Sequence, residues 1–70
     1  MSKLPQISHD RVIRALRRRG FWILREGKHV SMTDGRNLVI IPRHKVLKTG
    51  TLHHILKGAD LAVEEFLSLL

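Results

Sequence analysis

The hydrophobic and polar positions of the first twenty residues follow a helical period. Val12, Ile13 and Leu16 fall on one arc of a helical wheel, and arginines occupy the opposite arc. Ser8 is a good N-cap for this segment, and Gly20 suits the left-handed conformation that follows a helix end. The pattern predicts a helix that begins near Ser8 and ends before Gly20.

Three short runs rich in apolar residues follow, and their composition is typical of strands. They cover residues 21–25, 29–33 and 37–41. The second and third runs are separated by Asp34-Gly35 and its neighbours, which is a hairpin signal. We therefore expect a three-stranded antiparallel sheet after the first helix.

Two loop lengths are open for this hairpin, and they predict different pairings. A two-residue loop at Asp34 and Gly35 pairs Val30 with Val39. A three-residue loop that ends in a left-handed Gly35 pairs Val30 with Leu38. We favour the second register because it buries more apolar area on one face of the sheet. The residues of that face are Val30, Met32, Leu38 and Ile40.

His29 opens the second strand, and the alternation behind it predicts its face. If Val30 and Met32 point into the core, the period of two turns His29 and Ser31 to the opposite face. Trp22, in the first strand, is interpreted as a core residue rather than as a platform on which a base stacks.

The rest of the chain predicts one or two more helices. Pro42 ends the third strand, and a basic connection leads to a helix that starts near Thr49 and breaks at Gly58. Asp60 is interpreted as the start of a last, short helix. This order predicts an α+β domain with its helices on one face of the sheet. No repeat or linker interrupts it, so we expect a single domain over residues 1–70.

The charge of the chain indicates what kind of partner it binds. Residues 1–48 hold twelve Lys and Arg against three Asp and Glu, whereas residues 49–70 hold one against three. A basic body implies a polyanionic partner, and nucleic acid is the first choice. No apolar run approaches the roughly 20 residues that span a bilayer, and the start lacks the apolar segment of a signal peptide. We expect a soluble, cytoplasmic protein that does not bind membranes.

Several kinds of chemistry lack the residues that they need. The chain has no cysteine, and its five histidines form no H-x-x-x-H pair. His53 and His54 are adjacent, so on a helix they point about 100° apart. A glycine-flanked nucleophilic serine and a phosphate-binding loop of the Walker type are also missing. We expect neither a metal ion nor another cofactor.

A histidine beside cations remains, and it suits RNA cleavage without a metal. That reaction needs a base for the 2′-hydroxyl proton, an acid for the leaving 5′-oxygen and cations for the phosphate. Histidine serves either proton role at neutral pH, which makes His29 a candidate. The candidate RNA-binding residues are Arg25, Lys28, Arg43 and Lys45, together with a helical ridge of Arg11, Arg14 and Arg18. Spacing alone leaves open that His29 is a surface bystander and that the ridge only faces solvent.

The chain resembles a known family over nearly its whole length, from about Ile7 to Leu70. The resemblance is carried by GFWILREGKHVSM, with a Gly-x-His at the second strand, by the Pro-x-His within IPRHKVLKTGTLHHIL, and by the Lys-x-Gly-Thr-Leu that opens the next helix. In order and spacing these features are similar to the HicA toxins, also called the YcfA-like family.

This resemblance implies a fold and a function. HicA proteins have a double-stranded-RNA-binding-like α-β-β-β-α fold, and they are toxins of type II toxin–antitoxin modules that cleave mRNA and stop translation. The histidine that the family requires matches His29, and an antitoxin partner, HicB, covers the active site. Family members usually carry a small residue before this histidine. Here Lys28 stands at that position, which puts substrate preference and activity in question.

One histidine cannot be acid and base in a single step, so a second group is needed. His44, in the Pro-x-His that begins with Pro42, is the candidate for this role, and its alternative is a loop histidine that supports the turn. The rival to an endoribonuclease is a non-catalytic RNA-binding module that reads the shape of double-stranded RNA. A DNA-associated subunit is a weaker third interpretation.

Overall fold

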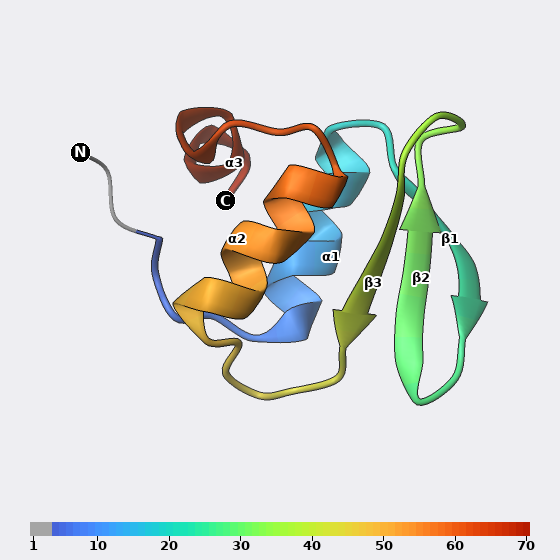
Figure 1. Ribbon diagram of the computed structural model, residues 1–70, viewed down its shortest axis with the longest axis horizontal. Coiled ribbons are helices and arrows are strands. Elements are labelled where there is room, and N and C mark those ends of the chain that lie inside the picture. The colour runs from blue at the N-terminus through green and yellow to red at the C-terminus, as the bar shows by residue number, and fades with distance from the viewer. Residues whose placement is uncertain (1–3) are drawn as a thin grey trace.

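Three antiparallel strands and three helices make up the computed structural model, which describes residues 4–70 (Figure 1). In chain order they are α1 (His9–Arg18), β1 (Trp22–Glu26), β2 (His29–Thr33), β3 (Leu38–Pro42), α2 (Thr49–Gly58) and α3 (Val63–Leu69). The strands lie in the order β1-β2-β3. The predicted α+β fold, its antiparallel sheet and the extra C-terminal helix are confirmed. The first three residues of the domain expected over 1–70 lie outside the described part.

The start and the end of α1 follow the predicted local chemistry. Ser8 is the N-cap, and its hydroxyl oxygen accepts a hydrogen bond of 3.4 Å from the backbone N–H of Arg11. Gly20 follows the helix with a φ of +99°, a conformation that glycine adopts without steric cost. Between them Val12, Ala15 and Leu16 are buried. The helix therefore begins and ends where the sequence predicts it.

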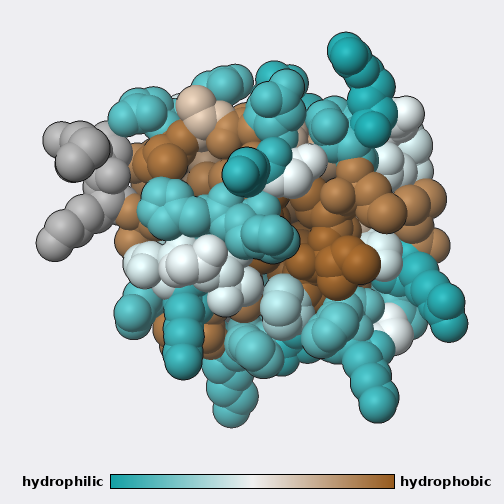
Figure 2. Space-filling view, in the orientation of Figure 1, coloured by the Kyte–Doolittle hydropathy of each residue, from teal (hydrophilic) through white to brown (hydrophobic). Residues whose placement is uncertain are grey.

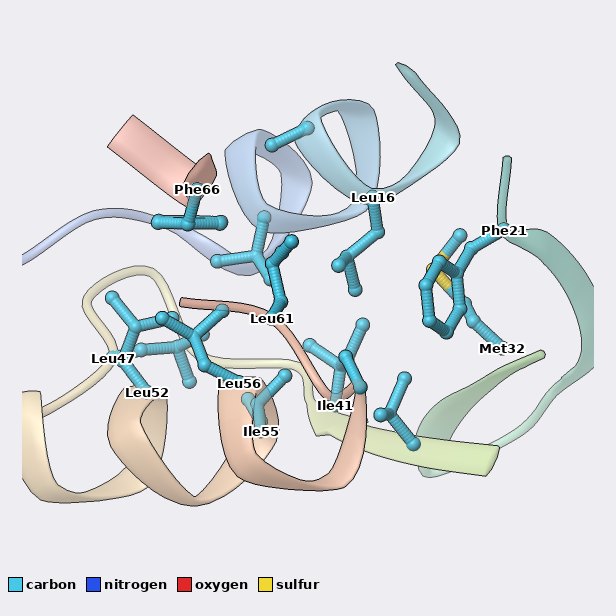
Figure 3. Packing of buried hydrophobic residues seen from close by; sticks show 14 of the residues in the cluster. Leu16, Phe21, Met32, Ile41, Leu47, Leu52, Ile55, Leu56, Leu61 and Phe66 are labelled. Atoms are coloured by element: carbon cyan, nitrogen blue, oxygen red, sulfur yellow. The ribbon is translucent and has the colours of Figure 1, made fainter. Parts of the chain in front are cut away.

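The hydrophobic core lies between one face of the sheet and the helices. In Figure 1, α1 and α2 cover the same side of the sheet, and α3 packs at the far side of the helical layer. Figure 3 shows side chains from all these layers meeting in one cluster. Among its fully buried members are Leu16, Met32, Ile41, Leu47, Leu52 and Phe66.

The register of the β2–β3 hairpin differs from both predicted registers. Val30 pairs with Ile41, and Met32 pairs with Val39. Val39 and Ile41 therefore face the core, where they are 3% and 0% exposed. The predicted inward face of Leu38 and Ile40 is wrong, because both side chains are more than half exposed on the outer face.

The loop of this hairpin explains the shift. Thr33 pairs with Leu38, so four residues lie between the paired positions. The carboxylate of Asp34 accepts hydrogen bonds from the backbone N–H groups of Arg36 at 2.9 Å and Asn37 at 2.7 Å. The Thr33 hydroxyl donates to the carbonyl of Asn37 and accepts from the N–H of Gly35. These side-chain bonds stabilise a longer loop than the two that the sequence suggests.

The C-terminal segment corrects one further prediction. Asp60 does not start the last helix. Instead it has a φ of +55° just after α2, whose C-cap is Ala59. The last helix begins at Val63, and its Phe66 is fully buried in the core. Asp60 therefore ends one helix rather than beginning the next.

The register predicts that replacing two neighbouring isoleucines lowers the free energy of unfolding by very different amounts. Replacing Ile41 with alanine should lower the free energy of unfolding by about 2–5 kcal/mol, because the side chain is fully buried. Replacing Ile40 should cost less than about 1 kcal/mol, because that side chain is 52% exposed. Urea unfolding of the two variants measures both values. A larger cost at Ile40 would favour the register with Leu38 and Ile40 inward.

The hairpin loop should make stability depend on acid pH. Hydrogen bonds from the backbone N–H groups of Asn37 and Arg36 hold the pKa of Asp34 below its usual value. The carboxylate therefore stabilises the fold above the unfolded-state pKa, and this contribution is lost as the pH falls through the lower folded pKa. The Tm of Asp34→Ala should lie below that of the wild type at pH 7, and the gap should narrow at acid pH. Asp34→Ser keeps an acceptor oxygen without a charge. The difference in Tm between Asp34→Ser and Asp34→Ala should therefore not change with pH.

Candidate active site

His29 lies at the open face of the sheet, as the alternation predicts. It is the first residue of β2 and pairs with Pro42 of β3. Val30 and Met32 are buried at 1% and 0% exposure, whereas the His29 side chain is exposed. Among the described residues it forms no hydrogen bond or ion pair, so both ring nitrogens face solvent and are accessible to a substrate.

A β-bulge brings Arg25 to the same face. The pairing of β1 with β2 shifts between Ile23 and Arg25, so Leu24 is an extra residue. Trp22 pairs with Thr33, and Arg25 pairs with Ser31. In a regular strand Trp22 and Arg25 would face opposite sides, but the bulge restores them to one face. Arg25 therefore lies on the same face as His29, because its partner Ser31 is two residues from His29 along β2.

The centre of this open face is apolar. Trp22, Leu38 and Ile40 are 48%, 57% and 52% exposed, and all three pair with outward-facing residues of β2. The expectation that Trp22 is a core residue is wrong, because the helices cover the other face. Figure 2 shows a hydrophobic area at the β3 edge of the sheet, where Leu38 and Ile40 line a hollow together with Ile55 of α2. We call Trp22, Leu38 and Ile40 the apolar face.

The predicted cations around His29 differ in their pairing. A guanidinium nitrogen of Arg43 lies 3.7 Å from a carboxylate oxygen of Glu26, in an ion pair exposed to solvent. Glu26 pairs with inward-facing Val30, which places this ion pair toward the helical side of the sheet. No carboxylate within residues 4–70 pairs with Arg25, Lys28 or Lys45. Lys28, in the β1–β2 turn next to His29, is thus an unneutralised charge beside the histidine.

His44 lies in the loop between β3 and α2, at the same end of the domain as His29. Figure 1 shows that the β1–β2 turn, this loop and the starts of α1 and α2 all gather at the lower end. The His44 side chain is exposed, and its backbone N–H donates to the carbonyl of Pro42 at 2.9 Å. Because Pro42 pairs with His29, the loop departs from the sheet beside the candidate site. Within the described chain no hydrogen bond joins the two imidazoles.

The arginine ridge lies apart from this site. Arg11, Arg14 and Arg18 are exposed on α1, where they line a hollow together with Leu69 and Leu70. A guanidinium N–H of Arg18 donates to the carbonyl of Leu69 at 2.6 Å. The ridge therefore belongs to the helical layer beside α3, whereas His29 is on the open face of the sheet. The structure separates the predicted RNA-binding residues into two groups.

The histidines do not gather into a metal site. Among residues 4–70, no group of three or more His, Asp or Glu side chains lies close enough to hold an ion. His9 contacts Asp10, with 3.4 Å between Nε2 and a carboxylate oxygen. This contact involves one carboxylate only, and the other ring nitrogen of His9 faces a backbone carbonyl. His9 is not among the residues predicted for the site, since nothing in the sequence places it beside a loop 35 residues away.

A comparison with protein families identifies the relationship of the chain. Residues 10–61 match the family model described as the HicA toxin of bacterial toxin–antitoxin systems. The chain belongs to the HicA toxin family. The match covers α1 from its second residue, the whole sheet and α2, so it includes His29, His44 and all the predicted cations. No similar protein was found among curated sequences.

Membership of the HicA family gives the chain a role and a kind of partner. HicA proteins are toxins, and a toxin of such a system works with an antitoxin. Within residues 4–70, none of the helices is both long enough and apolar enough to cross a membrane.

Proposed function

We propose that this HicA toxin is an endoribonuclease that cleaves mRNA and thereby inhibits translation. The observation that supports this most directly is an accessible, unpaired His29 with the free charge of Lys28 next to it. We further propose that residues 1–70 form one RNA-cleaving domain that acts in the cytoplasm, where mRNA is translated.

The proposed reaction needs no group beyond the chain and the RNA. A base removes the proton of a 2′-hydroxyl, and the 2′-oxygen then forms a bond to the adjacent phosphorus. The bond from phosphorus to the 5′-oxygen breaks, and an acid gives a proton to that oxygen, which leaves a 2′,3′-cyclic phosphate. His29 takes one proton role and His44 the other. Both are exposed at the same end of the domain, which is the arrangement that an RNA strand needs to reach them together.

The cations serve this reaction to different degrees. Arg25 and Lys28 are unpaired beside His29, and we propose that they hold the scissile phosphate and stabilise its added negative charge. Lys45 and Arg43 bind the neighbouring backbone, with Arg43 partly neutralised by Glu26. Arg11, Arg14 and Arg18 contact a more distant part of the RNA, because they lie in the helical layer. Lys28 thus extends phosphate binding at the position where the family resemblance implies a small residue in most members.

The apolar face offers a surface for a HicB-like antitoxin. Trp22, Leu38 and Ile40 expose about half of their side-chain surface on the face that carries His29. A few side chains that become buried near the centre of an interface contribute most of its affinity, and tryptophan is among the residue types enriched there. A partner that docks there and extends along β2 to its first residue covers His29 as well. We propose that this is how the antitoxin masks the active site.

Replacement of His29 tests the catalytic proposal. Purified wild-type protein, incubated with single-stranded RNA in EDTA, should cleave it, and His29→Ala should lower the rate by about 100-fold or more. The Tm of the variant should stay close to that of the wild type, since the side chain is exposed. Tight binding of RNA that stays intact with both proteins would contradict the proposal. That result would favour the non-catalytic RNA-binding module.

Replacement of Lys28 tests the role of its charge. In Lys28→Ala the slope of log K against log salt for single-stranded RNA should become shallower by about 0.7, which corresponds to one lost phosphate contact. Lys57→Ala is the matched control, because Lys57 is an exposed lysine in the last turn of α2, at the end of that helix away from the β3–α2 loop. The control slope should equal that of the wild type. An equal change in both variants would mean that Lys28 contributes only to the overall charge.

A further inference from the structure

His9 joins two parts of the chain that are 35 residues apart. The carbonyl oxygen of His44 accepts two hydrogen bonds from this one residue, from the backbone N–H at 3.1 Å and from ring Nδ1 at 3.0 Å. A carbonyl oxygen only accepts, so the Nδ1 atom carries the proton in this contact. His9 thus fixes the backbone of the residue that we propose as the second proton-transfer group.

The loop that carries His44 has few other anchors. Arg43, His44, Lys45 and Val46 are all exposed, and the buried side chain that follows them is Leu47. The backbone N–H of Leu47 donates to the carbonyl of Ile7 at 2.8 Å. The loop is therefore held at residues 7 and 9, which lie on either side of the N-cap of α1. Of these contacts, the bond from ring Nδ1 is the one made by a side-chain donor.

The surroundings of the ring keep it in this orientation. The His9 side chain is only 20% exposed, and Nε2 lies 3.4 Å from a carboxylate oxygen of Asp10. The two ring nitrogens are therefore directed at two oxygen atoms on opposite sides. His9 is the first residue of α1, and Ser8 caps that helix, so its backbone is fixed as well.

We infer that His9 is a positioning residue, which holds the β3–α2 loop through the His44 carbonyl so that the His44 imidazole is placed for proton transfer. This inference rests on the proposed ribonuclease function. It explains why a partly buried histidine stands at the start of α1, on the side of the domain away from the open face. It also gives the first residue of α1 a role beyond that of the Ser8 cap.

Two variants of His9 separate the hydrogen bond from the packing. Asparagine can place its amide N–H close to the position of Nδ1, whereas leucine fills similar space without a donor. His9→Leu should lower kcat for RNA cleavage by about threefold to tenfold with KM within about twofold of wild type, because the proton-transfer group is less well placed. His9→Asn should recover most of this loss. The Tm of both variants serves as a check on folding.

A double variant tests whether His9 acts through His44. In His44→Ala, the additional change His9→Leu should have no further effect on kcat, because the group that it positions is gone. Three results would overturn the inference: wild-type kcat in His9→Leu, equal losses in the leucine and asparagine variants, or a full additional loss in the His44→Ala background. Absence of cleavage by the wild type would overturn the proposed function itself, which distinguishes the two failures.

Discussion

The structure depends on the burial of one face of the sheet against the helices. Val30, Met32, Val39 and Ile41 fill that face, and each is at most 3% exposed. Because side chains alternate along a strand, this burial assigns every other residue of β2 and β3 to the opposite face. His29 is exposed for that reason. A change of one residue in the pairing would move the apolar set outward and turn the outer residues into the core.

Backbone hydrogen bonds between distant segments arrange the rest of the candidate site. The sheet places His29 and Pro42 side by side, and the loop after Pro42 is held by the segment that precedes α1. In consequence, three short elements converge at one end of the domain: the β1–β2 turn, the β3–α2 loop and the start of α1. Each of them brings a histidine or a cation. The site therefore needs the whole fold, although no side chain of its candidates is part of the core.

The sequence predicted those features that depend on local chemistry or on simple periodicity. Ser8 and Gly20 bound the first helix as expected, and the alternation around Val30 placed His29 on the correct face. The predicted hairpin register was wrong because the pairing depends on hydrogen bonds that the Asp34 side chain accepts and the Thr33 side chain donates within the loop, which the residue types permit but do not require. The bulge at Leu24 could not be predicted, because no glycine or proline marks it in the sequence. The hydrogen bonds between His9 and His44 could not be predicted either, because they join distant parts of the chain.

The open face combines two properties that usually oppose each other on the surface of a small protein. It exposes apolar side chains, which lowers solubility, while the net charge of +7 keeps copies of the chain apart by repulsion. In the proposed function the toxin binds RNA when free and an antitoxin when inhibited, so it needs both properties on one surface. We propose that the cations at its end attract RNA, whereas the apolar centre gains free energy only when a partner excludes water from it. In the proposed function the same face thus serves substrate and inhibitor, and an antitoxin that buries Trp22, Leu38 and Ile40 and extends along β2 closes the approach to His29.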